Sequence, residues 1–98
     1  MDDTTLRVTT RSSPTGELVL AVEGYLDAEG GSTLAREAGA VPEVDRLQIR
    51  IDLAAVTLFT CSGARRLIAV LEELTALGCR VDLRGVHHPL QRLLDLAA

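Results

Sequence analysis

The chain has 98 residues, enough for one domain with one hydrophobic core and too few for a second, so a single domain over residues 1–98 is expected. Ten basic residues, all arginine, stand against fourteen carboxylates and leave a formal charge of −4, the opposite of the balance typical of nucleic-acid-binding proteins. Apolar runs fall short of the ~20 residues of a membrane span and the polar residues 1–5 lack the features of a signal peptide, so we expect a cytoplasmic protein with neither membrane nor nucleic acid as partner.

The first two predicted elements are strands joined by a turn. Leu6 and Val8 alternate with polar neighbours, which is the period of a strand with one wet face. Turn-forming residues follow at 12–16, and the apolar stretch from Leu18 to Glu23 predicts a better-buried strand that ends at Gly24. Together these segments predict an N-terminal hairpin.

A helix and a third strand are predicted next. Asp27 suits the N-cap of a helix that runs to about Ala38, although the glycines near its start lower its helix propensity. After a loop at Pro42, apolar and polar residues alternate over 47–51. This alternation predicts a strand with one wet face, and therefore a sheet covered mainly on one side.

The second half of the chain predicts two helices around a short strand. From Ser62 to Leu77 apolar residues recur at helical spacing, and Gly78 is a natural stop. A strand over 81–83 is expected to end at Gly85, and Pro89 opens a final helix. The apolar stripe of that helix consists of Leu90, Leu93, Leu94 and Ala97.

The predicted order of elements is β-β-α-β-α-β-α. Strands that alternate with helices imply parallel pairing, whereas the first hairpin is antiparallel. We therefore predict an α/β fold with a mixed, mostly parallel four-stranded sheet, an N-terminal hairpin and helices packed mainly on one face.

One segment carries a candidate functional site. Residues 53–59 are predicted as the loop after the third strand, and Thr60, Cys61, Ser62 and Gly63 then open the longest helix. The first-turn N–H groups of a helix lack intrahelical partners and its dipole favours negative charge, so this place is receptive to a phosphate. Thr60 or Ser62 would serve equally as a simple N-cap, so both interpretations stay open.

Three stretches of the chain resemble the STAS family, the domain shared by sulfate-transporter tails and anti-sigma factor antagonists. Members typically read Asp-Leu-Ser-Gly-Val-Thr-Phe, an apolar residue, then Asp-Ser-Ser-Gly-Leu, and Asp52 to Ala64 align with this pattern without a gap. Val22 to Asp27 is similar to the family's Gly-x-Leu-Asp turn, and residues 83–85 with 92–96 are similar to its usual ending. The resemblance covers most of the chain.

The resemblance implies a protein-binding switch without catalytic activity or cofactor. In antagonists of this kind the serine before the glycine, here Ser62, is phosphorylated by an anti-sigma factor that is itself an ATP-dependent serine kinase. The unphosphorylated form binds the anti-sigma factor and frees a sigma factor, and phosphorylation breaks the complex. The implied partner-binding residues are Asp27, Thr60, Cys61, Ser62, Gly63, Arg65 and Arg66.

The chain departs from the family pattern at three positions. Thr60 replaces the family's acidic residue, Cys61 the preceding serine and Ala64 the leucine after the glycine. Thr60 favours an alternative role as a scaffold or accessory subunit, in a signalling assembly or a lipid-transport complex, in which the serine is never phosphorylated. Arg65 and Arg66 either contact a phosphate or an acidic partner, or are simply solvated.

The remaining candidates have competing explanations. Asp27 is either a partner contact or only a helix cap. Cys61 at a helix N-terminus, with His87 and His88 as conceivable bases, raises the alternative of a thiol enzyme or redox sensor. The spacing of the two cysteines and two histidines matches no zinc motif, and no phosphate-binding glycine loop occurs, so we predict no metal and a kinase substrate rather than an ATP user. Cys61 and Cys79 fit free thiols, with a disulfide as the alternative.

Overall fold

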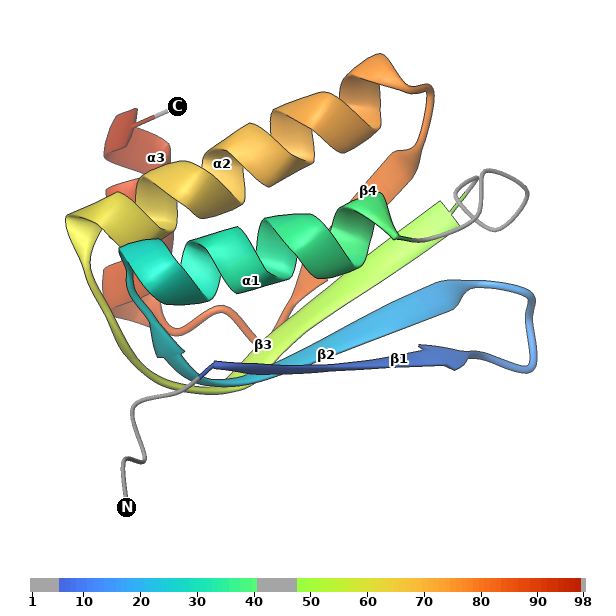
Figure 1. Ribbon diagram of the computed structural model, residues 1–98, viewed down its shortest axis with the longest axis horizontal. Coiled ribbons are helices and arrows are strands. Elements are labelled where there is room, and N and C mark those ends of the chain that lie inside the picture. Colours follow the sequence, from blue (N-terminus) through green and yellow to red (C-terminus); the bar gives the residue numbers. More distant parts are fainter. Residues whose placement is uncertain (1–5, 41–47, 98) are drawn as a thin grey trace.

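The computed structural model describes residues 6–40 and 48–97. It contains the predicted order of elements (Figure 1): β1 (Arg7–Ser12), β2 (Leu18–Leu26), α1 (Ala28–Gly39), β3 (Gln48–Phe59), α2 (Cys61–Ala76), β4 (Arg80–Arg84) and α3 (His88–Ala97). The expectations for residues 1–5, Pro42, position 47 and the side chain of Ala97 lie outside the described part of the chain.

The four strands of the described chain form one sheet in the order β1-β2-β3-β4. β1 and β2 pair antiparallel, as the predicted hairpin requires, with Ser12 opposite Leu18. β2 and β4 each pair parallel with β3, so that Leu18 and Val81 both lie opposite Ile49. The mixed, mostly parallel sheet is therefore confirmed.

Helices α1 and α2 lie over one face of the sheet, and the core fills the space between them and the strands (Figure 1). Apolar side chains on alternate positions of β2 and β3 point into this layer, and each fully buried one contributes about 2 kcal/mol. The largest fully buried side chains are Leu20, Val22, Leu26, Leu34, Ile49, Ile51, Leu53, Leu67 and Leu90.

The prediction of a loop over 53–59 is wrong, because β3 continues through all of these residues and ends at Phe59. The pairing with β2 skips one residue of β3 between Ala21 and Glu23, and another between Gly24 and Tyr25. Each such bulge inserts an extra residue on one strand and breaks the alternation of apolar and polar side chains. The pattern of apolar and polar residues over 53–59 is therefore irregular, although the backbone there is still paired with β2.

Gly24 does not end β2, contrary to the prediction. β2 extends to Leu26, and Gly24 lies inside it with φ +104°, a conformation that glycine adopts at little cost. The hydroxyl of Thr57 on β3 donates to the Gly24 carbonyl at 3.2 Å. The glycine thus accommodates the second bulge and lets the strand carry on.

Helix α2 ends as predicted at Gly78. The amide of Gly78 donates to the Thr75 carbonyl at 2.9 Å, and the amide of Cys79 to the Leu74 carbonyl at 3.0 Å. This pair of bonds is the Schellman arrangement, which satisfies the last carbonyls of a helix and turns the chain away. The turn directs the chain into β4.

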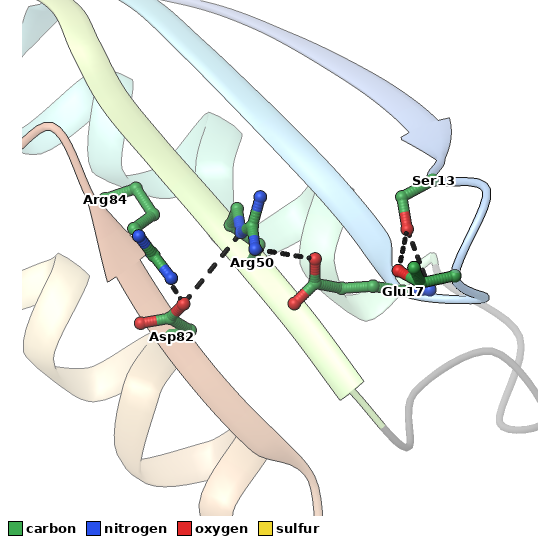
Figure 2. Close-up of polar contacts among 6 residues, drawn as sticks. Ser13, Glu17, Arg50, Asp82 and Arg84 are labelled. Carbon is green, nitrogen blue, oxygen red and sulfur yellow. Dashed lines mark hydrogen bonds and ion pairs between the residues drawn. The ribbon is translucent and has the colours of Figure 1, made fainter.

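The outer face of the sheet carries a polar network centred on Arg50 (Figure 2). Arg50 Nη2 lies 3.1 Å from Glu17 Oε1, whose side chain is only 9% exposed, and Arg50 Nε lies 3.9 Å from Asp82 Oδ2. Arg84 Nε donates to the same Asp82 oxygen at 2.7 Å, and this hydrogen bond raises the pKa of Arg84 above its usual value. Arg50 therefore neutralises a carboxylate that is nearly out of water.

Replacing Arg50 tests this network. Arg50→Met keeps the apolar stem but leaves Glu17 without its cation, so we expect the free energy of unfolding to fall by about 2 kcal/mol in urea titrations. Arg7→Met is the matched control, because Arg7 and Glu23 pair at 3.4 Å with side chains that are 77% and 53% exposed. That change should cost less than about 0.5 kcal/mol. Equal losses of unfolding free energy in the two variants would contradict the conclusion that the burial of Glu17 makes its ion pair matter more.

Candidate functional site at the start of helix α2

Thr60 is the N-cap of α2. Its backbone is extended, its side-chain oxygen accepts the Gly63 amide at 3.0 Å, and its own amide donates to the Leu26 carbonyl at 3.0 Å. Of the two capping residues that the sequence allowed, the structure therefore selects Thr60. Ser62 lies in the first turn and is not needed to begin the helix.

Ser62 and Cys61 are both exposed in that first turn. The first backbone bond of the helix runs from the Ala64 amide to the Thr60 carbonyl, so the amides of Cys61 and Ser62 precede the intrahelical ladder. The first turn contains no acidic residue. No acidic side chain of this turn therefore compensates the positive end of the helix dipole, which lies where Ser62 is exposed.

Gly63 is buried against the backbone of the β2–α1 junction. A Cβ on Gly63 would overlap the Leu26 carbonyl and lie 2.9 Å from the Cα of Asp27. Only glycine fits at this distance, so the start of α2 rests directly on the end of β2. This contact fixes where the exposed residues before Gly63 are presented.

Asp27 caps α1. Its carboxylate accepts the Gly30 amide at 2.7 Å, and its carbonyl accepts the Gly31 amide at 2.7 Å. Because Leu26 lies opposite Phe59 in parallel pairing, α1 and α2 begin at the same edge of the sheet. The capping role is therefore confirmed, and a partner contact remains a separate prediction.

Arg65 and Arg66 are exposed on the second turn of α2. The stem of Arg66 packs on α1, where a Cβ on Gly31 would lie 2.5 Å from the Arg66 Cβ. The two helices thus approach closely at Gly31. The guanidinium groups add positive charge near the helix start, which favours an acidic group there.

An apolar rim beside Thr60 was missed by the sequence reasoning. Leu58 is 52% exposed, and Tyr25 and Phe59 are partly exposed. The predicted turn and loop contain these residues, although Leu58 and Phe59, two large apolar residues next to each other before the helix, are a usable signal. A cavity of about 160 Å³ opens here, lined by Tyr25, Leu26, Asp27, Leu58, Phe59 and Thr60.

The cysteines and histidines do not form a site together in the described chain. Cys61 and Cys79 are free thiols, the first exposed and the second buried. His87 Nε2 lies 3.0 Å from the carbonyl of Ala54 on β3, so the ring is engaged away from Cys61. Within residues 6–40 and 48–97 no three His, Cys, Asp or Glu side chains are grouped to hold a metal ion, and no helix is long and apolar enough to span a membrane.

The mixed four-stranded sheet, the helices on one face and the capped start of α2 define the class of the molecule, a small α/β domain of the STAS type. The family model described as "Mlab, STAS domain" matches residues 9–98, and the chain belongs to this family. A search of curated protein sequences found no match.

Solved structures share the fold. An anti-sigma factor antagonist from Mycobacterium paratuberculosis is 26% identical with a TM-score of 0.72, covering 98% of this chain and 80% of that one. The phosphorylated form of the Bacillus cell fate determinant SpoIIAA is 14% identical with a TM-score of 0.72, covering 94% of this chain and 84% of that one. Mglu is 18% identical with a TM-score of 0.72 over 82% of this chain, which spans only 20% of Mglu. These last two likenesses show the fold alone.

The Gly63 contact predicts a severe effect of one methyl group. Gly63→Ala should lower the free energy of unfolding by about 3 kcal/mol or more, because the new Cβ must displace the Leu26 carbonyl or the start of α2. Gly39→Ala is the matched control, since a Cβ there meets nothing within 4 Å. That change should be neutral or stabilising by about 0.5 kcal/mol in the same urea titration. A tolerated Gly63→Ala would show that α2 can begin elsewhere.

Proposed function

We propose that this protein is an anti-sigma factor antagonist that is switched by phosphorylation. In its unphosphorylated form it binds an anti-sigma factor, itself a serine kinase, and thereby releases a sigma factor in the cytoplasm. Phosphorylation of Ser62 ends this binding. The protein acts by binding and not by catalysis, without a cofactor, and neither nucleic acid nor membrane is its partner. The observation that carries the proposal is the exposed Ser62 hydroxyl in a first turn that Thr60 already caps.

The surroundings of Ser62 suit a protein interface. The exposed Leu58 and the cavity beside Thr60, two residues before Ser62, offer apolar contact area at the start of α2. A phosphate on Ser62 would carry about −1.5 to −2 charges, and in the free domain the helix dipole and water would solvate it. Inside a desolvated interface the same charge would be costly. Modification would then leave the fold intact and remove the complex.

The relatives support the same reading. The similar structure from Mycobacterium paratuberculosis is that of an anti-sigma factor antagonist, and SpoIIAA has been solved in unphosphorylated and phosphorylated forms. In both SpoIIAA structures the fold matches this chain with TM-scores of 0.71 and 0.72. The fold of this chain is therefore similar to both the unphosphorylated and the phosphorylated form, as the proposed switch requires.

A second candidate function is a STAS scaffold or accessory subunit whose Ser62 is never phosphorylated. The observation that favours it is Thr60, which caps α2 as an aspartate would but brings no negative charge. If the family's acid helps to position the kinase, its loss removes that contact. The two candidate functions share a fold and differ in whether Ser62 is phosphorylated.

The first test is phosphorylation by candidate anti-sigma kinases with ATP, followed by intact-mass measurement and site mapping. We expect one phosphate on Ser62, none on Ser62→Ala, and an unchanged result for Ser12→Ala, an exposed serine on β1. The phosphorylated protein should bind the kinase at least about a hundredfold more weakly, which corresponds to about 3 kcal/mol. Stable binding without modification would reject the switch and support the scaffold. Thr60→Asp then shows whether the missing acid limits the reaction.

Negative charge at Ser62, which should weaken the complex, should instead stabilise the fold of the free domain. Ser62→Asp places a carboxylate in the first turn of α2, so the free energy of unfolding should rise by about 0.5 kcal/mol at low salt and less at high salt. Ser12→Asp on β1 has no helix dipole to meet and serves as control. Destabilisation by Ser62→Asp, measured by thermal unfolding, would contradict the assigned electrostatics.

A further inference from the structure

A second surface, separate from the Ser62 site, is an open apolar groove between α2 and α3. Its volume is about 630 Å³, within the range of binding sites in proteins. None of its lining residues belongs to the site around Ser62. We call it the α2–α3 groove, and it is lined by Ile68, Leu71, Glu72, Thr75, Ala76, Leu83, Gln91, Leu94 and Asp95.

The groove combines an apolar floor with an acidic rim. Among the described residues, the charged lining of the groove consists of the carboxylates of Glu72 on α2 and Asp95 on α3 and includes no arginine. Gln91 Nε2 donates to Asp95 Oδ1 at 2.9 Å, which holds that carboxylate in place. The occupant that complements this chemistry is an apolar side chain accompanied by a positive charge.

The outer face of α3 offers that combination. Leu96 is 82% exposed, the most exposed large apolar side chain in the described chain. Arg92, also exposed, lies four residues earlier and therefore on the same face of the helix. An exposed leucine and an arginine one turn apart match the groove in both polarity and charge.

We propose that the occupant is a second copy of this chain. Leu96 of each copy packs on the apolar floor of the other's groove, and Arg92 pairs with the rim carboxylate of Asp95. Both the groove and the Arg92–Leu96 face border α3, so a twofold axis beside α3 lets the two contacts form at once. The interface is then isologous and closes at two copies.

The dimer leaves the Ser62 site free. The groove begins on α2 at Ile68, beyond the first two turns that carry Ser62 and the arginines. Each copy in the pair can therefore still present its serine. The inference does not rest on the proposed switch, because it predicts self-association whether or not Ser62 is ever phosphorylated.

Sedimentation of the purified chain tests the proposal. A small, partly polar interface should give a reversible dimer between about 10 μM and about 1 mM. Leu96→Glu should weaken dimerisation at least tenfold, because it puts a charge on the apolar floor beside two carboxylates. Leu58→Glu is the matched control: Leu58 is also an exposed leucine but lies outside the groove, so the dimer should be unchanged.

Charge exchange makes the test specific to the proposed pair. Arg92→Glu and Asp95→Arg should each be monomeric, because every copy then meets a like charge across the axis. An equimolar mixture of these two variants should dimerise again, since both contacts in the mixed pair are restored. All the changed residues are exposed, and circular dichroism confirms that the variants are folded. A chain that stays monomeric at 1 mM, or a dimer that ignores Leu96→Glu and the charge exchange, would overturn the proposal.

Discussion

The backbones of β2 and α2 touch where Gly63 lies against Leu26 and Asp27 with no side chain between them. The same junction is held by the hydrogen bond from the Thr60 amide to the Leu26 carbonyl. Because Leu26 is also the residue before the cap of α1, one contact sets the positions of both helix starts relative to the sheet. The exposed residues of the candidate site owe their placement to a buried glycine rather than to contacts of their own.

This junction also shapes the electrostatics of the site. Two neighbouring parallel strands end at one edge, so the helices that follow direct their positive dipole ends to the same place. At α1 the carboxylate of Asp27 occupies that position and accepts the Gly30 amide. At α2 the neutral Thr60 performs the capping, and the first turn of α2 contains no acidic residue. The threonine thus begins the helix without adding negative charge, which makes the surroundings of Ser62 more receptive to an anion.

The sequence predicted what depends on short-range pattern and missed what depends on strand register. Three signals each involve only a few neighbouring residues: the alternation over 47–51, the cap at Asp27 and the stop at Gly78. The structure confirms the strand and the two helix ends that they mark. The bulges opposite β2 insert extra residues into β3, so no regular period remains over 53–59. The apolar rim around Leu58 was therefore overlooked. The α2–α3 groove, built from residues of α2, β4 and α3 between positions 68 and 95, has no signature within any one element.

Helix α2 links the two surfaces through its own dipole. Its first turn, with Ser62, has free amide groups and no acid, which suits a negative group. Its second half borders the groove, where the negative end of the dipole adds to the carboxylates of Glu72 and Asp95 and suits a positive group. Phosphate at one end and an arginine at the other would each be stabilised by the helix, and neither would disturb the other. A domain of this size can therefore hold a modification switch and a self-association surface on a single helix without competition between them.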